Sequence, residues 1–250
     1  MFDLTGRKAL VTGASGGIGG AIAHALHAQG AEVVLAGRRR EALDALANEL
    51  GDRTHVVTAD LGSAEADEGL AKAAEEAMGQ VDILVNNAGV TADTLAMRMK
   101  DEVWQRVLDL NLTSGFRIIR TLLRGMLKRR HGRVIGITSV VGVTGNPGQV
   151  NYAAAKAGMV SFTRSWALEL AAFGITVNAV APGPVETELF NTNNPPGSES
   201  RTRYIEGVPM KRLGLPEELA AANCYFLSGQ SGFTTGQTLF VDGGYMTGKS

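Results

Sequence analysis

The chain has 250 residues, 44% of them hydrophobic, and its formal net charge is −1. This composition supports a sizeable folded core and lacks the signature of a disordered chain. Lys and Arg run for three consecutive residues at most, so the basic footprint of a nucleic-acid-binding domain is missing and no nucleic-acid partner is expected.

Other residue types exclude further classes of protein. The single cysteine, Cys224, cannot form an intramolecular disulfide, and the four histidines are dispersed without a metal-ligand pattern, so no metal site is expected. The sequence shows neither a signal peptide nor an apolar run of about twenty residues. We therefore expect a soluble cytoplasmic protein with no membrane partner.

Short β-branched runs alternate along the chain with longer stretches of helical periodicity. The predicted strands, in chain order, span residues 8–12, 32–36, 54–59, 82–86, 133–138, 175–180 and 239–241. Strands joined by helices imply right-handed crossovers. The prediction is an α/β fold, a Rossmann-type doubly wound parallel sheet of about seven strands with helices on both faces. No composition shift divides it, so residues 1–250 are predicted to form a single domain.

The first predicted strand runs into Gly13, Gly17 and Gly19 and then into a helix. Glycine permits a positive φ and close approach of the backbone to a ligand, and a helix N-terminus presents N–H groups to phosphate. The spacing is Gly-x-x-x-Gly-x-Gly rather than Gly-x-Gly-x-x-Gly. A turn that only reverses the chain is the alternative, but three glycines between a strand and a helix favour dinucleotide binding.

The residues after the second predicted strand indicate which dinucleotide is bound. An NAD site places an acidic side chain about twenty residues beyond the glycines, whereas this chain reads Gly37-Arg38-Arg39-Arg40 there. A guanidinium group suits a 2′-phosphate, and we predict NADPH/NADP with Arg38 as a ligand. The alternative is that the arginines only solvate a helix start. Because positive charge is unfavourable at a helix N-terminus, the phosphate explains their placement better.

Tyr152 and Lys156 stand four residues apart in a helical pattern, and Ser139 precedes the tyrosine by thirteen residues. The spacing holds a phenol and an ammonium group on one helix face. Reduction of a ketone needs a proton at the carbonyl oxygen. We expect Tyr152 to supply it, Lys156 to lower the pKa of Tyr152, and Ser139 to donate a hydrogen bond to the substrate oxygen.

These features occur in an order and spacing that resemble the short-chain dehydrogenase/reductase family. The matching motifs are the turn at residues 12–19, Asp60-Leu61, residues 86–89, Asn111, Ser139, Tyr152 with Lys156, and Pro182-Gly183. Within that family, residues 96–101 and 140–152 resemble those of 3-oxoacyl-[acyl-carrier-protein] reductases. The resemblance covers nearly the whole chain and implies a combined dinucleotide-binding and catalytic domain.

The resemblance also implies roles for individual residues. The implied catalytic residues are Ser139, Tyr152, Lys156 and Asn111, and the implied cofactor contacts are Gly13, Ser15, Gly17, Ile18, Gly19, Arg38, Asp60, Leu61, Asn87, Ala88, Gly89, Tyr152, Lys156, Pro182, Gly183, Val185 and Thr187. Among these, Asp60 is expected beside the adenine, Asn87 near the adenosine ribose and Thr187 at the nicotinamide carboxamide. Lys156 is expected to bind the nicotinamide ribose as well, and Asn111 to hold a water that links Lys156 to solvent. Two structural alternatives remain open: Asp60 capping the next helix and Asn87 bonding across the sheet.

The expected activity is NADPH-dependent reduction of a 3-oxoacyl thioester, carried by acyl-carrier protein or coenzyme A, to the 3-hydroxyacyl form. A reductase or dehydrogenase of free small ketones or alcohols is the alternative. A non-enzymatic dinucleotide sensor is a third hypothesis, and the presence of Ser139, Tyr152 and Lys156 together argues against it, because a sensor needs only the glycine turn.

Three features bear on the substrate and the assembly. The basic run 128–131 either frames the site entrance for an acidic carrier protein or caps a helix C-terminus, and Phe173 stands where carrier-protein reductases often have arginine. Residues 186–212 are predicted to form a substrate lid, in which Pro195 and Pro196 prevent regular structure over residues 191–200. Apolar positions on the predicted helices around residues 108–127 and 159–170 predict a homotetramer.

Overall fold

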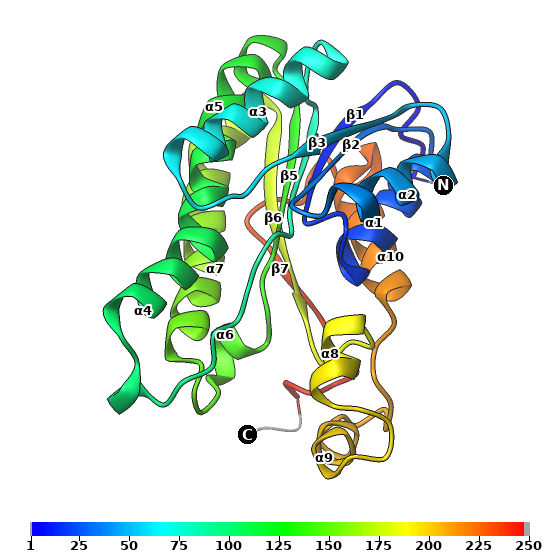
Figure 1. Ribbon diagram of the computed structural model, residues 1–250. Helices are drawn as coiled ribbons and strands as arrows, with labels where there is room; N and C mark the ends of the chain where they lie inside the picture. The colour runs from blue at the N-terminus through cyan, green and yellow to red at the C-terminus, as the bar shows by residue number, and fades with distance from the viewer. Residues whose placement is uncertain (1, 248–250) are drawn as a thin grey trace.

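The computed structural model describes residues 2–247, with one parallel seven-stranded sheet between two layers of helices (Figure 1). The strand order is β3-β2-β1-β4-β5-β6-β7. The strands are β1 (Lys8–Thr12), β2 (Glu32–Gly37), β3 (Thr54–Thr58), β4 (Ile83–Asn86), β5 (Gly132–Ile137), β6 (Ile175–Pro182) and β7 (Thr238–Val241). The predicted fold class is therefore confirmed, and each predicted strand overlaps an observed one.

Helices cover both faces of this sheet. The principal helices are α1 (Gly17–Ala28), α2 (Arg40–Leu50), α3 (Ala64–Met78), α4 (Asp101–Leu108), α5 (Ser114–Arg129), α7 (Val150–Leu170) and α10 (Pro216–Leu227). Shorter elements are α6 (Val141–Thr144), α8 (Glu188–Asn193), α9 (Glu199–Gly207), the 3-10 turns η1 (Ala96–Arg98), η3 (Ala171–Phe173) and η4 (Gly229–Ser231), and the π-helical turn η2 (Asp109–Thr113). Among residues 2–247, no helix is long and apolar enough to cross a membrane.

Alternate strand residues feed two hydrophobic cores, one on each face of the sheet. Val11, Leu35 and Val85 pack with α1, α2 and α10, and their strand neighbours Leu10 and Val34 pack with α3, α5 and α7. Because a parallel sheet covered on both faces buries the side chains of its central strands, these strands read as continuous apolar runs. This burial explains why short runs of Val, Ile and Leu were sufficient to locate the strands.

Local signals set the ends of several helices. The Ser63 side chain accepts a hydrogen bond from the Ala66 amide at the start of α3, and Gly79 ends that helix in the left-handed conformation. Pro216 occupies the first turn of α10, where its missing N–H costs nothing. Because Ser63 caps α3, the alternative that Asp60 caps this helix is wrong.

The predicted lid differs from its expected form. Residues 191–200 were expected to lack regular structure, but α8 extends to Asn193 and α9 begins at Glu199. Only residues 194–198, which contain Pro195 and Pro196, lie between the two helices. Prolines interrupt a helix because they lack an N–H group and clash with the preceding turn, but this effect is confined to one short linker.

Candidate active site

The sequence-predicted site residues follow the carboxyl ends of the strands. The turn after β1, the start of α2 after β2, residues 87–89 after β4, Ser139 after β5 and residues 183–187 after β6 all lie at this edge. The strand order reverses between β1 and β4, and such switch points are where doubly wound sheets bind ligands. The fold therefore places the predicted site residues around one location.

The glycine turn packs too closely for side chains. Gly13 has a φ of +67°, and a Cβ atom there would lie 2.8 Å from Asn87 Nδ2. A Cβ atom at Gly19 would lie 2.2 Å from the carbonyl oxygen of Gly13. No side chain caps the first turn of α1, whose N-cap residue is Gly16. The turn thus brings bare backbone to a helix N-terminus, which fits a dinucleotide pyrophosphate.

Thr12 and Asn87 join this turn to the end of β4. The Thr12 hydroxyl accepts hydrogen bonds from the amides of Asn87 and Ala88, both at 3.0 Å. Asn87 Nδ2 donates to the carbonyl oxygens of Thr12 (3.0 Å) and Gly13 (3.2 Å). Asn87 therefore bonds across the sheet, which was the structural alternative for this residue. Thr12 was not predicted as a site residue. Its position as a threonine at the end of a predicted strand could have indicated such a role, and the structure shows that its side chain is buried.

The three arginines after β2 have different partners. Arg38 Nε lies 3.8 Å from Asp60 Oδ1, and Arg39 donates a hydrogen bond to the carbonyl oxygen of Ser15 in the glycine turn. Arg40 instead pairs with Asp44 within α2 at 2.8 Å. Arg38 and Arg39 therefore stand beside the predicted adenosine site, and Arg40 belongs to the helix surface. Sequence reasoning selected Arg38 but not Arg39.

Ser139, Tyr152 and Lys156 come together between the end of β5 and α7. Ser139 lies beside Tyr152, and its hydroxyl accepts a hydrogen bond from the Val141 amide at 3.2 Å. Lys156 Nζ lies 5.5 Å from the Tyr152 ring centroid and donates to the carbonyl oxygen of Ile137 at 2.8 Å. The three side chains are thus held as one cluster.

Burial controls the pKa values of this cluster. Removal from water raises the pKa of Tyr152 to about 12, and the hydrogen bond from Ser139 only partly opposes this effect. Removal from water also lowers the pKa of the Lys156 ammonium to about 8. The expectation that Lys156 lowers the pKa of Tyr152 below its usual value is therefore wrong for this form of the protein, because the desolvation of the phenol is the larger effect.

Asn111 lies in the π-helical turn η2, a type of irregularity that often occurs at functional sites. Its Nδ2 donates to the carbonyl oxygens of Val90 and Val107, both at 2.9 Å. Within residues 2–247, its buried Oδ1 has no hydrogen-bond partner. A Cβ atom added at Gly89 would lie 2.4 Å from that oxygen and 3.6 Å from Lys156 Nζ. The polar atoms of Asn111 and Lys156 therefore approach the same glycine.

The remaining predicted contacts lie after β6. Pro182 ends the strand, and a Cβ atom at Gly183 would lie 2.8 Å from Asp242 Cα. Val185 is buried. A Cβ atom at Gly17 would lie 3.2 Å from the Thr187 side chain, so the start of the lid rests against the glycine turn.

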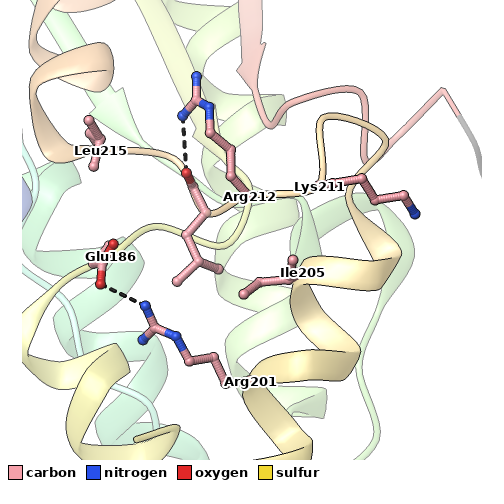
Figure 2. Close-up of a pocket in the computed structure, with 7 residues that line it drawn as sticks. Glu186, Arg201, Ile205, Lys211, Arg212 and Leu215 are labelled. Atoms are coloured by element: carbon pink, nitrogen blue, oxygen red, sulfur yellow. Dashed lines mark hydrogen bonds and ion pairs between the residues drawn. The ribbon is translucent and has the colours of Figure 1, made fainter. Parts of the chain in front are cut away.

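A cavity of about 310 Å³ is lined mainly by residues of the lid segment 186–212, and Figure 2 shows the side chains that line it. Its lining residues are Glu186, Arg201, Ile205, Lys211, Arg212, Leu213 and Leu215. Arg201 pairs with Glu186 at 2.6 Å, and Arg212 pairs with Glu218 at the same distance. No member of the cluster of Ser139, Tyr152 and Lys156 lines this cavity.

The two sequence features that bear on a carrier protein lie at the opposite edge of the sheet. The run Lys128-Arg129-Arg130-His131 lies at the end of α5, just before β5 begins, and Phe173 lies just before β6. Arg130 caps the helix and donates to the carbonyl oxygen of Ala172. Of the two alternatives, the helix-capping role is the one observed. The run does not frame the site of its own subunit.

No group of three or more His, Cys, Asp or Glu side chains placed to hold a metal ion occurs among residues 2–247. The candidate site therefore consists of a glycine cradle, a polar amide network and the cluster of Ser139, Tyr152 and Lys156.

Comparison with known proteins places this geometry in a family. A family model described as "Enoyl-(Acyl carrier protein) reductase" matches residues 13–246. Nodulation protein G of Rhizobium sp. (strain N33) is 52% identical over 244 residues, which cover 98% of each chain. The 3-oxoacyl-[acyl-carrier-protein] reductase FabG of Rickettsia bellii is 47% identical over 246 residues, covering 98% of this chain and 99% of the relative.

Solved structures give the same result. A crystal structure from Agrobacterium tumefaciens, provisionally described as a gluconate dehydrogenase, has a TM-score of 0.93 and 33% identity, with 98% of each chain covered. Another, described as a short chain dehydrogenase/reductase family protein, has a TM-score of 0.89 and 36% identity, covering 98% of this chain and 99% of its own. The family implies a nicotinamide dinucleotide as cofactor, and the glycine cradle fits one. The chain is an oxidoreductase that belongs to the short-chain dehydrogenase/reductase family.

Proposed function

We propose that this oxidoreductase reduces a 3-oxoacyl thioester to the 3-hydroxyacyl thioester with NADPH. The observation that carries the proposal is the cluster of Ser139, Tyr152 and the buried Lys156. The identity of 47% to a 3-oxoacyl-[acyl-carrier-protein] reductase supports the substrate class.

The proposed chemistry assigns a task to each side chain. The nicotinamide cofactor supplies a hydride to the carbonyl carbon. With a pKa of about 12, Tyr152 carries its proton at neutral pH and donates it to the carbonyl oxygen. Ser139 donates a second hydrogen bond to that oxygen and stabilises the negative charge that develops there. Lys156 then returns a proton to Tyr152, and a water that donates to Asn111 Oδ1, which is unpartnered among residues 2–247, would link Lys156 to solvent.

The proposed preference for NADPH rests on Arg38 and Arg39, which would contact the 2′-phosphate. Hydrogen bonds to charged groups contribute about 1.5 to 3 kcal/mol. Arg38→Ala is therefore expected to lower kcat/KM for NADPH about ten- to a hundredfold and to affect NADH much less. Arg40→Ala is the matched control, because Arg40 pairs within α2. Equal losses with both cofactors after Arg38→Ala would contradict this role.

A second candidate substrate class is free small ketones or alcohols. One observation favours it: the basic run 128–131 and Phe173 lie on the edge of the sheet opposite the site, so neither marks a carrier-protein dock at the site of the same subunit. Electrostatic docking of an acidic partner needs such charges near the entrance.

NADPH absorbance with a substrate panel separates these candidates. The panel compares one 3-oxoacyl group on acyl-carrier protein and on coenzyme A with simple neutral ketones. We expect a higher kcat/KM for both thioesters than for the ketones. The reverse order would favour the second candidate. NADPH binding without turnover on any member would contradict both and favour a dinucleotide sensor.

A further inference from the structure

A carboxylate lies near the reacting tyrosine without a cation beside it. Asp93 is exposed, and both of its carboxylate oxygens accept hydrogen bonds from Gln149 Nε2, at 3.0 and 2.9 Å. Gln149 is the N-cap residue of α7 and precedes Tyr152 by three positions. Its Oε1 accepts a hydrogen bond from Asn146 Nδ2 at 3.0 Å. A chain of neutral amides therefore holds the charge in place.

Backbone contacts fix the segment that carries Asp93. The Thr94 amide donates to the carbonyl oxygen of Gly148 at 2.8 Å, and Asn151 Nδ2 donates to that of Ala92 at 3.5 Å. Residues 92–94 are thus joined to the loop that leads from Ser139 to Tyr152. The carboxylate cannot move away from the site unless these contacts break.

The charge of Asp93 acts on the site itself. Among residues 2–247, Asp93 forms no ion pair within 4.0 Å, so its described partners leave the negative charge uncompensated. After burial, the repulsion from Asp93 is the other effect that raises the pKa of the Tyr152 phenol. Negative charge that forms at the phenol oxygen is therefore disfavoured by Asp93, and negative charge on a bound substrate must meet the same field.

Three exposed side chains in the segments that carry Asp93, Ser139 and Tyr152 are apolar. Val143 lies in α6, the turn that follows Ser139, and is 57% exposed. Val150 begins α7 two residues before Tyr152 and is 44% exposed. Leu95, close to Asp93 in sequence, is 60% exposed. Such side chains suit an uncharged, partly apolar acyl group.

We propose that Asp93 selects substrates that are uncharged next to the reacting carbonyl, and that it discriminates against free 3-oxo acids. This inference rests on the proposed function, in which the carbonyl lies at Ser139 and Tyr152. In a 3-oxo acid the carboxylate carbon is two bonds from the ketone carbon, whereas thioester formation removes that charge. At separations of several ångströms and an effective dielectric constant between that of a protein surface and water, repulsion between two like charges changes a rate constant by about three- to thirtyfold.

The test compares one acyl group with and without its charge. The substrates are 3-oxobutanoate and its neutral N-acetylcysteamine thioester, each measured with NADPH in the wild type and in Asp93→Asn. Asparagine keeps an oxygen that accepts from Gln149 Nε2 and removes only the charge. We expect the ratio of kcat/KM for the anion to kcat/KM for the thioester to rise about three- to thirtyfold. Glu76→Gln, an exposed acid on α3 without an ion pair within 4.0 Å, is the matched control and leaves the ratio unchanged.

Two further measurements separate charge from folding. In the wild type, raising the ionic strength from about 0.02 to 0.5 M reduces the difference in kcat/KM between the thioester and the anion, because exposed charges are screened. In Asp93→Asn, the pH at which the reverse oxidation of the alcohol gains activity moves lower, since the repulsion of Asp93 no longer opposes ionisation of the phenol. A merely structural role for Asp93 does not move that pH.

The outcomes are distinct. The selection by charge is overturned if Asp93→Asn leaves the anion-to-thioester ratio of kcat/KM unchanged. It is also overturned if the wild-type difference in kcat/KM between the two substrates does not depend on salt. A wild type that fails to reduce the neutral thioester overturns the proposed function instead.

Discussion

At the residue scale, local spacing brings the reacting groups together and burial sets their charge states. Tyr152 and Lys156 share a face of α7 because they are four residues apart. Their pKa values move in opposite directions because both groups lose water, and desolvation favours the neutral form of each. The phenol is therefore a proton donor, and the ammonium group is poised to exchange a proton near pH 8.

Removal of the phenol hydroxyl tests the role of Tyr152. Tyr152→Phe is expected to lower kcat by about 10²- to 10⁴-fold, the usual contribution of a positioned acid. NADPH binding, followed by fluorescence titration, should be largely retained because the glycine cradle is untouched. Turnover close to that of the wild type would contradict the assignment.

The buried Lys156 predicts a pH dependence of stability. Its pKa falls from 10.5 in the unfolded chain to about 8 in the fold, so the unfolded state binds more protons between these values. The Lys156 contribution to the free energy of unfolding should therefore rise from pH 8 to pH 10.5, by about 3 kcal/mol. Urea unfolding gives the free energy of unfolding of the wild type and of Lys156→Met at each pH. The difference between the two values measures the Lys156 contribution. A difference that stays constant or falls over this window would show that the ammonium is not desolvated.

At the element scale, the lid is two short helices held by one arginine. Arg201 of α9 donates to Glu186 at 2.6 Å and to Asn191 of α8 at 2.7 Å. Phe190 of α8 packs edge to face on Tyr204 of α9, with ring centroids 5.3 Å apart. These contacts join α8 to α9 across the proline linker. We expect the segment 186–212 to move as a unit when substrate binds.

Loss of the Arg201 contacts should loosen the lid. Two hydrogen bonds between charged or polar partners are each worth about 1 to 3 kcal/mol, so Arg201→Ala is expected to raise KM about tenfold and to increase hydrogen exchange over residues 188–207. Arg203→Ala is the control, because Arg203 is exposed and lies 4.0 Å from Glu199 on the same helix. Identical exchange in both variants would mean that Arg201 does not hold the lid.

At the scale of the whole molecule, α5 and α7 present apolar side chains on their outer surfaces. Phe116 and Trp166 pack against each other with ring centroids 5.9 Å apart, and Phe116 stays 40% exposed. Leu168 is 85% exposed. Met159 and Leu170, by contrast, are buried within the subunit, so only part of the apolar pattern on these helices is available for contact between subunits.

These surfaces predict a homotetramer, because self-complementary apolar faces commonly close into symmetric assemblies. Multi-angle light scattering should give about four times the 26.2 kDa chain mass at micromolar concentration. Phe116→Glu should shift the distribution to smaller species, since it places a charge at the contact. A wild type that elutes as a stable monomer would contradict the prediction.

The sequence by itself determined the features that depend on neighbours along the chain. Apolar runs located the strands because both faces of a parallel sheet are buried, and the spacing of Tyr152 and Lys156 required only a helix. The glycine turn was recognisable because Gly13 needs a positive φ.

Tertiary structure decided what depends on atoms from distant segments. It placed Phe173 and the run 128–131 on the edge opposite the site, brought Arg39 to Ser15 and joined Thr12 to Asn87. It also reversed the expected shift in the pKa of Tyr152. Hydrophobic periodicity records how one segment meets the core, whereas desolvation and long-range hydrogen bonds arise only when segments far apart in sequence exclude water from the same group.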